Sequence, residues 1–126
     1  MSAYDSIHFR PPAPTASVSF INPINNALTI DNVNMLLDTG ADSSIVPLGV
    51  VNALRCEFED AVWEVTSIAS EELLVLRSAK LQMHLGRYKF NSSFLVASVD
   101  IGVIGRNLLN LVRVRLDGPA QDWRFD

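Results

Sequence analysis

Apolar and polar residues alternate along much of the chain, with the period of two that is typical of strands with one buried face. Residues 15–21 (TASVSFI) and 80–86 (KLQMHLG) show this alternation most clearly. The second segment places Leu81, Met83 and Leu85 on one face and polar residues on the other. Both segments are therefore predicted to be strands that pack against a core.

Turn residues divide much of the remaining chain into further short strands. Residues 27–37 (ALTIDNVNMLL) predict two strands with a sharp connection near Asp31 and Asn32. Residues 61–85 predict a strand-rich region that breaks at 68–71. Near the C-terminus, a turn at 117–119 (DGP) separates an alternating segment from a final strand.

Two segments have helical spacing instead. Apolar residues recur every third position in residues 48–55, and Pro47 suits the first turn of a helix there. Residues 106–112 (RNLLNLV) predict a second short helix. Many short strands with two brief helices indicate a mainly β barrel or sandwich.

The length of 126 residues predicts one domain, with residues 1–14 as an extended lead-in and 15–126 as the folded part. The prolines in residues 10–14 (RPPAP) disfavour helix in this lead-in. The net charge of −4 argues against a general nucleic-acid binder, which would carry a basic patch. We therefore expect no nucleic-acid partner.

The single cysteine, Cys56, excludes an intrachain disulfide and suits a reducing compartment. The N-terminal residues lack the apolar stretch of a secretory signal, and no apolar run is long enough to span a bilayer. A cytoplasmic protein without a membrane partner is expected. His8 and His84 lie in no ligand-spaced cluster, so we expect no metal and no other cofactor.

Residues 34–47 (NMLLDTGADSSIVP) contain an apolar run that ends in Asp38. A carboxylate at the end of a buried strand must be paired, hydrogen-bonded or protonated. Gly40 allows the chain to turn and its N–H to point at that carboxylate, and the Thr39 hydroxyl can hold the loop by hydrogen bonds. These residues can fix a carboxylate at the floor of a cleft, although an isolated Asp-Thr-Gly also fits an ordinary surface turn.

A fixed carboxylate becomes more useful for amide hydrolysis when a second carboxylate shares one proton with it. The ionised member takes a proton from water, while the protonated member donates to the scissile carbonyl. Like charges roughly 3 Å apart cannot both ionise, so one member stays protonated.

Residues 36–42 (LLDTGAD) resemble the active-site loop of the retropepsins, the aspartic proteases typified by retroviral proteases. Residues 103–109 (VIGRNLL) resemble a second element of that family, which packs behind the active-site loop. Both motifs occur in the family's order, and the resemblance extends from about residue 18 to residue 116. The LDGP sequence near the C-terminus is similar to cellular, non-viral members.

The resemblance implies a retropepsin-like closed barrel, the acid protease fold, and aspartic endopeptidase activity. Asp38 would be the catalytic carboxylate. Asp42 would lie at the substrate edge and form a structural ion pair with Arg106. The active-site loop would be supported by Thr39, which bonds across the paired loops, by Gly40 and by Ala41.

The resemblance also implies a β-hairpin flap that closes over a bound peptide. The candidate flap residues are Thr66, Ser67, Ile68, Ala69 and Ser70. This tip lacks the glycines common in retropepsin flaps, which indicates another turn type, a less mobile flap or an ordinary connecting hairpin.

The chain holds one Asp-Thr-Gly and is too short for two lobes, so a second copy must supply the second carboxylate. We therefore expect a homodimer whose cleft binds a peptide or protein substrate in extended conformation. The terminal residues 120–126 (AQDWRFD), with Trp123 and Phe125, are a candidate interface strand. The alternative is a catalytically weak or inactive module that uses the same fold for dimerisation or peptide binding.

Overall fold

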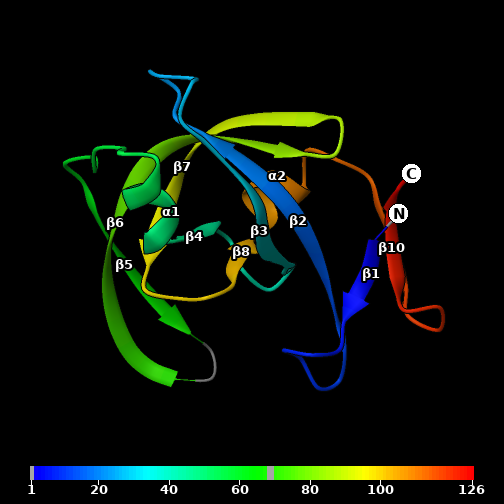
Figure 1. Ribbon diagram of the computed structural model, residues 1–126. Helices are drawn as coiled ribbons and strands as arrows, with labels where there is room; N and C mark the ends of the chain where they lie inside the picture. The colour runs from blue at the N-terminus through cyan, green and yellow to red at the C-terminus, as the bar shows by residue number, and fades with distance from the viewer. Residues whose placement is uncertain (1, 68–69) are drawn as a thin grey trace.

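The computed structural model describes residues 2–67 and 70–126, and it confirms a mainly β fold with two short helices (Figure 1). The strands are β1 (Ser2–Asp5), β2 (Ala13–Ile21), β3 (Thr29–Leu37), β4 (Ile45–Pro47), β5 (Val62–Ser67), β6 (Ser70–Leu85), β7 (Tyr88–Ala97), β8 (Gly102–Ile104), β9 (Val114–Asp117) and β10 (Asp122–Phe125). The helices are α1 (Leu48–Ala53) and α2 (Arg106–Leu109).

The strands form one sheet in the order β5-β6-β7-β4-β8-β3-β2-β1-β10-β9. An additional pairing between β6 and β2 closes six of them into a ring. The alternation in residues 80–86 is confirmed, because Leu81, Met83 and Leu85 are all buried. The core of the ring also contains Phe20 and Phe94, whose rings meet edge to face at 5.4 Å between centroids. Apolar burial on this inner face is the main force that holds the fold together.

Residues 27–37 differ from the sequence-based expectation of two strands. A single strand, β3, runs through Asp31 and Asn32 and pairs with β2 along its length. The pairing shifts between Val18 and Phe20, where one residue of β2 lies opposite two residues of β3. Asn32 adopts a left-handed φ of 59°, so the polar residues that indicated a turn form a β-bulge instead.

Both predicted helices are present, and both are shorter than their sequence patterns indicated. Pro47 precedes α1 as expected, and the helix buries Val50 and Val51. The second helix ends at Leu109 rather than continuing to Val112. The N–H of Val112 bonds to the carbonyl of Leu109, three residues back, so the chain continues as a tight turn.

The N-terminal residues join the sheet through β1. This strand pairs with β10 on one side and with the start of β2 on the other. Figure 1 shows β1 and β10 side by side, apart from the β5–β6 hairpin. No helix among the described residues is both long and apolar enough to cross a membrane.

Candidate active site

Two parallel strands that belong to the ring, β3 and β8, position the Asp38 loop. Strand β3 pairs with β8, so that Leu37 lies opposite Ile104. The pairing continues one step beyond β3, where the Asp38 N–H donates to the Ile104 carbonyl at 3.0 Å. Because Ile104 is fully buried, the backbone of Asp38 is anchored directly to the core.

The carboxylate of Asp38 is held by its own loop. The Gly40 N–H donates to Asp38 Oδ1 at 2.8 Å, and the Ala41 N–H donates to the Asp38 carbonyl at 3.3 Å. A Cβ at Gly40 would lie only 3.0 Å from Asp38 Oδ1, so glycine permits this close approach. Asp38 is half-buried while Thr39 and Gly40 are exposed, which leaves the loop accessible to a second molecule.

The segment after β8 packs behind this loop. The Arg106 N–H donates to the Ala41 carbonyl at 2.8 Å, and Arg106 Nη1 donates to the Thr39 carbonyl at 2.7 Å. A Cβ at Gly105 would lie 2.5 Å from the Ser43 carbonyl oxygen, so only glycine fits here without a backbone shift. These contacts brace both sides of the turn that carries Asp38.

Arg106 therefore has a different partner from the one expected. Within the described part of the chain, the two ion pairs are His8–Asp5 and Arg115–Asp126, and Asp42 forms neither. Asp42 is exposed, whereas the Arg106 guanidinium reaches back to a backbone carbonyl of the loop. A charged donor to a carbonyl gives the loop the rigidity that the ion pair was expected to give.

Ser44 is a supporting residue that the sequence did not single out. Its side chain is buried, and Oγ accepts the Gly105 N–H at 3.0 Å while donating to Asn107 Oδ1 at 2.8 Å. One hydroxyl thus ties the end of the Asp38 loop to the start of α2. The sequence pattern does not distinguish Ser44 from its neighbour Ser43, because only the tertiary contacts show that Ser44 is the buried one.

Of the candidate flap residues, Thr66, Ser67 and Ser70 lie at the end of the β5–β6 hairpin. Thr66 lies near the end of β5 opposite Leu73, and Ser67 pairs with Ser70. Ile68 and Ala69 lie outside the described residues. A β-hairpin therefore lies between the two motifs, and its role as a flap stays a prediction.

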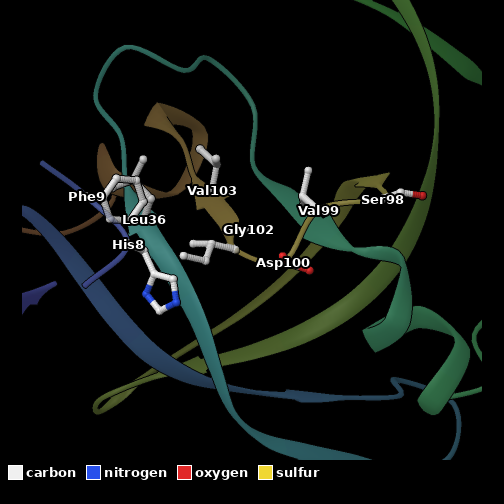
Figure 2. Close-up of a pocket in the computed structure, with 9 residues that line it drawn as sticks. His8, Phe9, Leu36, Ser98, Val99, Asp100, Gly102 and Val103 are labelled. Carbon is white, nitrogen blue, oxygen red and sulfur yellow. The ribbon is translucent and has the colours of Figure 1, made fainter. Parts of the chain in front are cut away.

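A pocket of about 540 Å³ lies beside the strands that deliver Asp38 (Figure 2). Leu36 and Val103 contribute to its lining, and they are paired neighbours on β3 and β8. The other lining residues come from residues 8–9 and from residues 98–102. Leu36 is two residues before Asp38 on the same chain segment, so the pocket lies beside the strand that leads to this carboxylate.

Asp5 holds His8 at the edge of this pocket. Asp5 Oδ1 accepts the N–H groups of Ile7 and His8, and Oδ2 lies 2.8 Å from His8 Nδ1. Asn34 on β3 donates to Asp5 Oδ2 at 3.2 Å, which links this turn to the barrel. The backbone and side-chain hydrogen bonds from His8 lower the pKa of Asp5 from 3.8 to about 2.

The lowered pKa of Asp5 predicts a pH-dependent contribution to stability. A depressed folded-state pKa means that the contribution is present above pH 3.8 and is lost as the pH falls through about 2. We expect Asp5→Asn to unfold at lower urea concentration than the wild type at neutral pH. The difference between the two proteins should shrink as the pH falls from 3.8 toward 2. A difference that stays constant over this range in urea titrations would contradict this role of Asp5.

The remaining candidate groups do not form a second site. Among the described residues, no three His, Cys, Asp or Glu side chains gather closely enough to hold a metal ion. His84 lies on β6 and bonds to Gln82 Oε1 at 2.9 Å. Partial burial raises the pKa of the Cys56 thiol, which keeps it in the unreactive protonated form.

Comparison with known proteins gives two findings. A family model described as retroviral aspartyl protease matches residues 21–117. Among solved structures, the chain is similar to EIAV protease complexed with the inhibitor HBY-793, with 22% sequence identity and a TM-score of 0.56. That similarity covers 84% of this chain and 90% of the EIAV protease chain, and it shows a shared fold. No curated protein matches the sequence.

Proposed function

Because the chain belongs to the retroviral aspartyl protease family, whose model matches residues 21–117, we propose that it is an aspartic endopeptidase with Asp38 as its catalytic residue. The observation that carries this proposal is the Asp38 loop itself. Its carboxylate accepts the Gly40 N–H at 2.8 Å, and Arg106 braces the turn from behind. A rigid, half-exposed carboxylate of this kind is suited to act on a bound water.

The proposed active species is a homodimer. Each chain supplies one Asp-Thr-Gly sequence, so a twofold axis between two copies brings two Asp38 carboxyls together. At hydrogen-bonding range the two groups share one proton. The Thr39 side chain is exposed in the single chain, where it is free to bond across the axis to the partner's loop.

In this dimer, hydrolysis requires no cofactor. The ionised Asp38 takes a proton from water, and the water oxygen attacks the scissile carbonyl carbon. The partner's Asp38 donates its proton to the carbonyl oxygen, which gives a neutral tetrahedral diol. The diol then collapses: the protonated Asp38 gives its proton to the leaving amine as the C–N bond breaks, and the partner's ionised Asp38 takes a proton from a hydroxyl of the diol. The products are one carboxylic acid and one amine, and the dyad again holds a single proton.

Exposed apolar residues on the β5–β6 hairpin favour an extended peptide as the substrate. Leu73 and Val75 lie on the face of β6 that buries Ala79 and Leu81 further along the strand, because side chains alternate with a period of two. Yet Leu73 is 54% exposed and Val75 is 61% exposed. The inner face of the hairpin thus continues beyond the core, where a peptide in the cleft would cover it.

The test of this proposal is peptide cleavage measured across dilution. Sedimentation velocity gives the fraction of dimer at each protein concentration, and a peptide library gives the initial cleavage rate. We expect the rate per chain to fall in parallel with the dimer fraction, since a monomer holds only one carboxylate. Cleavage whose rate per chain stays constant while the protein is monomeric would contradict the shared dyad.

A further inference from the structure

The pocket of Figure 2 lies on the same face of β3 as the Asp38 carboxylate. Leu37 is buried in the core, and side chains alternate along a strand, so Leu36 and Asp38 both lie on the opposite face. The alternation extends to Asp38 because its N–H continues the β3–β8 ladder by donating to Ile104. Positions two residues apart in a strand are separated by about 7 Å. The Leu36 wall of the pocket is therefore one side-chain length from the carboxylate.

The pocket combines apolar walls with one carboxylate. Figure 2 shows Phe9 and Leu36 on one side of it, and Val99 with Asp100 on the other. No lysine or arginine is among the described residues that line it. Asp100 is exposed, and neither ion pair within residues 2–67 and 70–126 involves it. Apolar walls beside a carboxylate match a side chain that has an aliphatic stem and a cationic end.

The chain on both sides of Asp100 is anchored in the sheet. Ala97, the last residue of β7, pairs with Pro47, and Gly102, the first residue of β8, pairs with Met35. The segment between these anchors comprises only residues 98–101. A connection this short between two paired strands keeps Asp100 at the edge of the pocket.

The histidine that lines the pocket does not cancel the charge of Asp100. His8 lies beside Asp5, whose Oδ2 is 2.8 Å from His8 Nδ1. Asp5 is ionised at neutral pH, because its pKa is lowered to about 2. The His8–Asp5 pair is therefore negative when the imidazole ring is neutral, and without net charge when the ring is protonated. In both states the pair and Asp100 together are negative.

We infer that this pocket selects a lysine or arginine side chain next to the scissile bond, and that Asp100 determines the preference. The inference deepens the proposed function, on which it rests, because cleavage at Asp38 defines which side chain of the peptide reaches the pocket. The apolar walls contact the methylene groups of that side chain, and the Asp100 carboxylate pairs with its ammonium or guanidinium group. Without Asp100 the same walls favour an uncharged apolar side chain.

The test uses three peptides that differ only in the residue before the cut, which is lysine, norleucine or glutamate. Norleucine has an unbranched aliphatic stem like that of lysine, without the charge. We expect kcat/KM for the lysine peptide to exceed that for the norleucine peptide by about three- to fivefold, the upper range for a partly exposed ion pair. Added salt should reduce this ratio, because it screens exposed charges.

Variants at Asp100 show whether this residue causes the preference. Asp100→Asn should bring the lysine-to-norleucine ratio close to one, and Asp100→Lys should cleave the glutamate peptide faster than the lysine peptide. Asp60→Asn removes a negative charge at an exposed position outside the pocket, so it is the matched control and should keep the wild-type ratio. A ratio near one in the wild type, or an equal ratio in the wild type and Asp100→Asn, would overturn the inference.

Fluorescently labelled forms of the same peptides separate this inference from the catalytic proposal, because anisotropy measures binding without cleavage. If the wild type cleaves all three peptides equally, the role of Asp100 is wrong and the catalytic proposal stands. If the wild type cleaves none but binds the lysine peptide most tightly, and Asp100→Asn removes that difference, the pocket is supported and the catalytic proposal fails. If the wild type neither cleaves nor binds the peptides, both fail.

Discussion

Asp38→Asn should reduce peptide cleavage by at least about 10³-fold, which is the scale of effect for removing a general acid or base. The amide has the same shape as the carboxyl, and its oxygen can still accept the Gly40 N–H that lies 2.8 Å from Asp38 Oδ1. It cannot take a proton from water, however, and both copies in the dimer lose this ability. Initial rates on a peptide library at several pH values measure the loss.

Asp60→Asn, at an exposed position outside the site, is the matched control and should cleave at the wild-type rate. Sedimentation should show that Asp38→Asn remains a dimer, so that the loss of activity is chemical. Equal cleavage by the wild type and Asp38→Asn would exclude Asp38 as the catalytic group. Equal peptide binding by both, with cleavage by neither, would instead support the peptide-binding module.

Gly105→Ala should lower the free energy of unfolding by about 3 kcal/mol, the upper end of the usual cost of overpacking. Its Cβ would lie 2.5 Å from the Ser43 carbonyl oxygen and 2.7 Å from the Ser43 carbonyl carbon. Both are backbone atoms, so the strain can be relieved only by moving the loop or the start of α2. Urea unfolding measures the stability, and the cleavage rate should fall as well, because displacing a catalytic group by about 1 Å can cost 10²-fold.

Gly49→Ala is the matched control for this substitution. A Cβ at Gly49 meets nothing within 4 Å, and the residue lies in α1, where alanine is favoured over glycine. We expect a gain of roughly 0.5–1 kcal/mol in stability and no change in cleavage. If both variants lost a similar amount of stability, the close approach at Gly105 would not be the cause of the destabilisation.

Much of the fold could be predicted from the sequence, because the signals that carry it are local. The alternation at Leu81, Met83 and Leu85 fixes a strand and its buried face, since successive side chains of a strand point to opposite sides. The prediction failed at Asp31 and Asn32, where polar residues can form either a turn or a bulge. The partner strand β2 decided between them by pairing on both sides of the irregularity.

The candidate site likewise contains some contacts that the local sequence predicts and others that it does not. A carboxylate followed by threonine and glycine specifies its own turn, so the contact between Gly40 and Asp38 is encoded within three residues. The contacts of Arg106 with Thr39 and of Ser44 with Asn107 join residues more than 60 positions apart in the chain. No local pattern distinguishes the Thr39 carbonyl from the Asp42 carboxylate as the partner of Arg106.

The sequence by itself thus determined a mainly β chain, two short helices and a single carboxylate loop of the aspartic protease type. Only the tertiary structure decided that Ser44 is buried beneath the loop, that Arg106 binds a backbone carbonyl, and that β10 lies between β1 and β9. The physical reason is the separation along the chain over which each kind of interaction acts. Backbone preferences and side-chain periodicity act over a few residues, whereas the partners of a buried hydroxyl, a guanidinium or a strand edge are set by packing among segments distant in the chain.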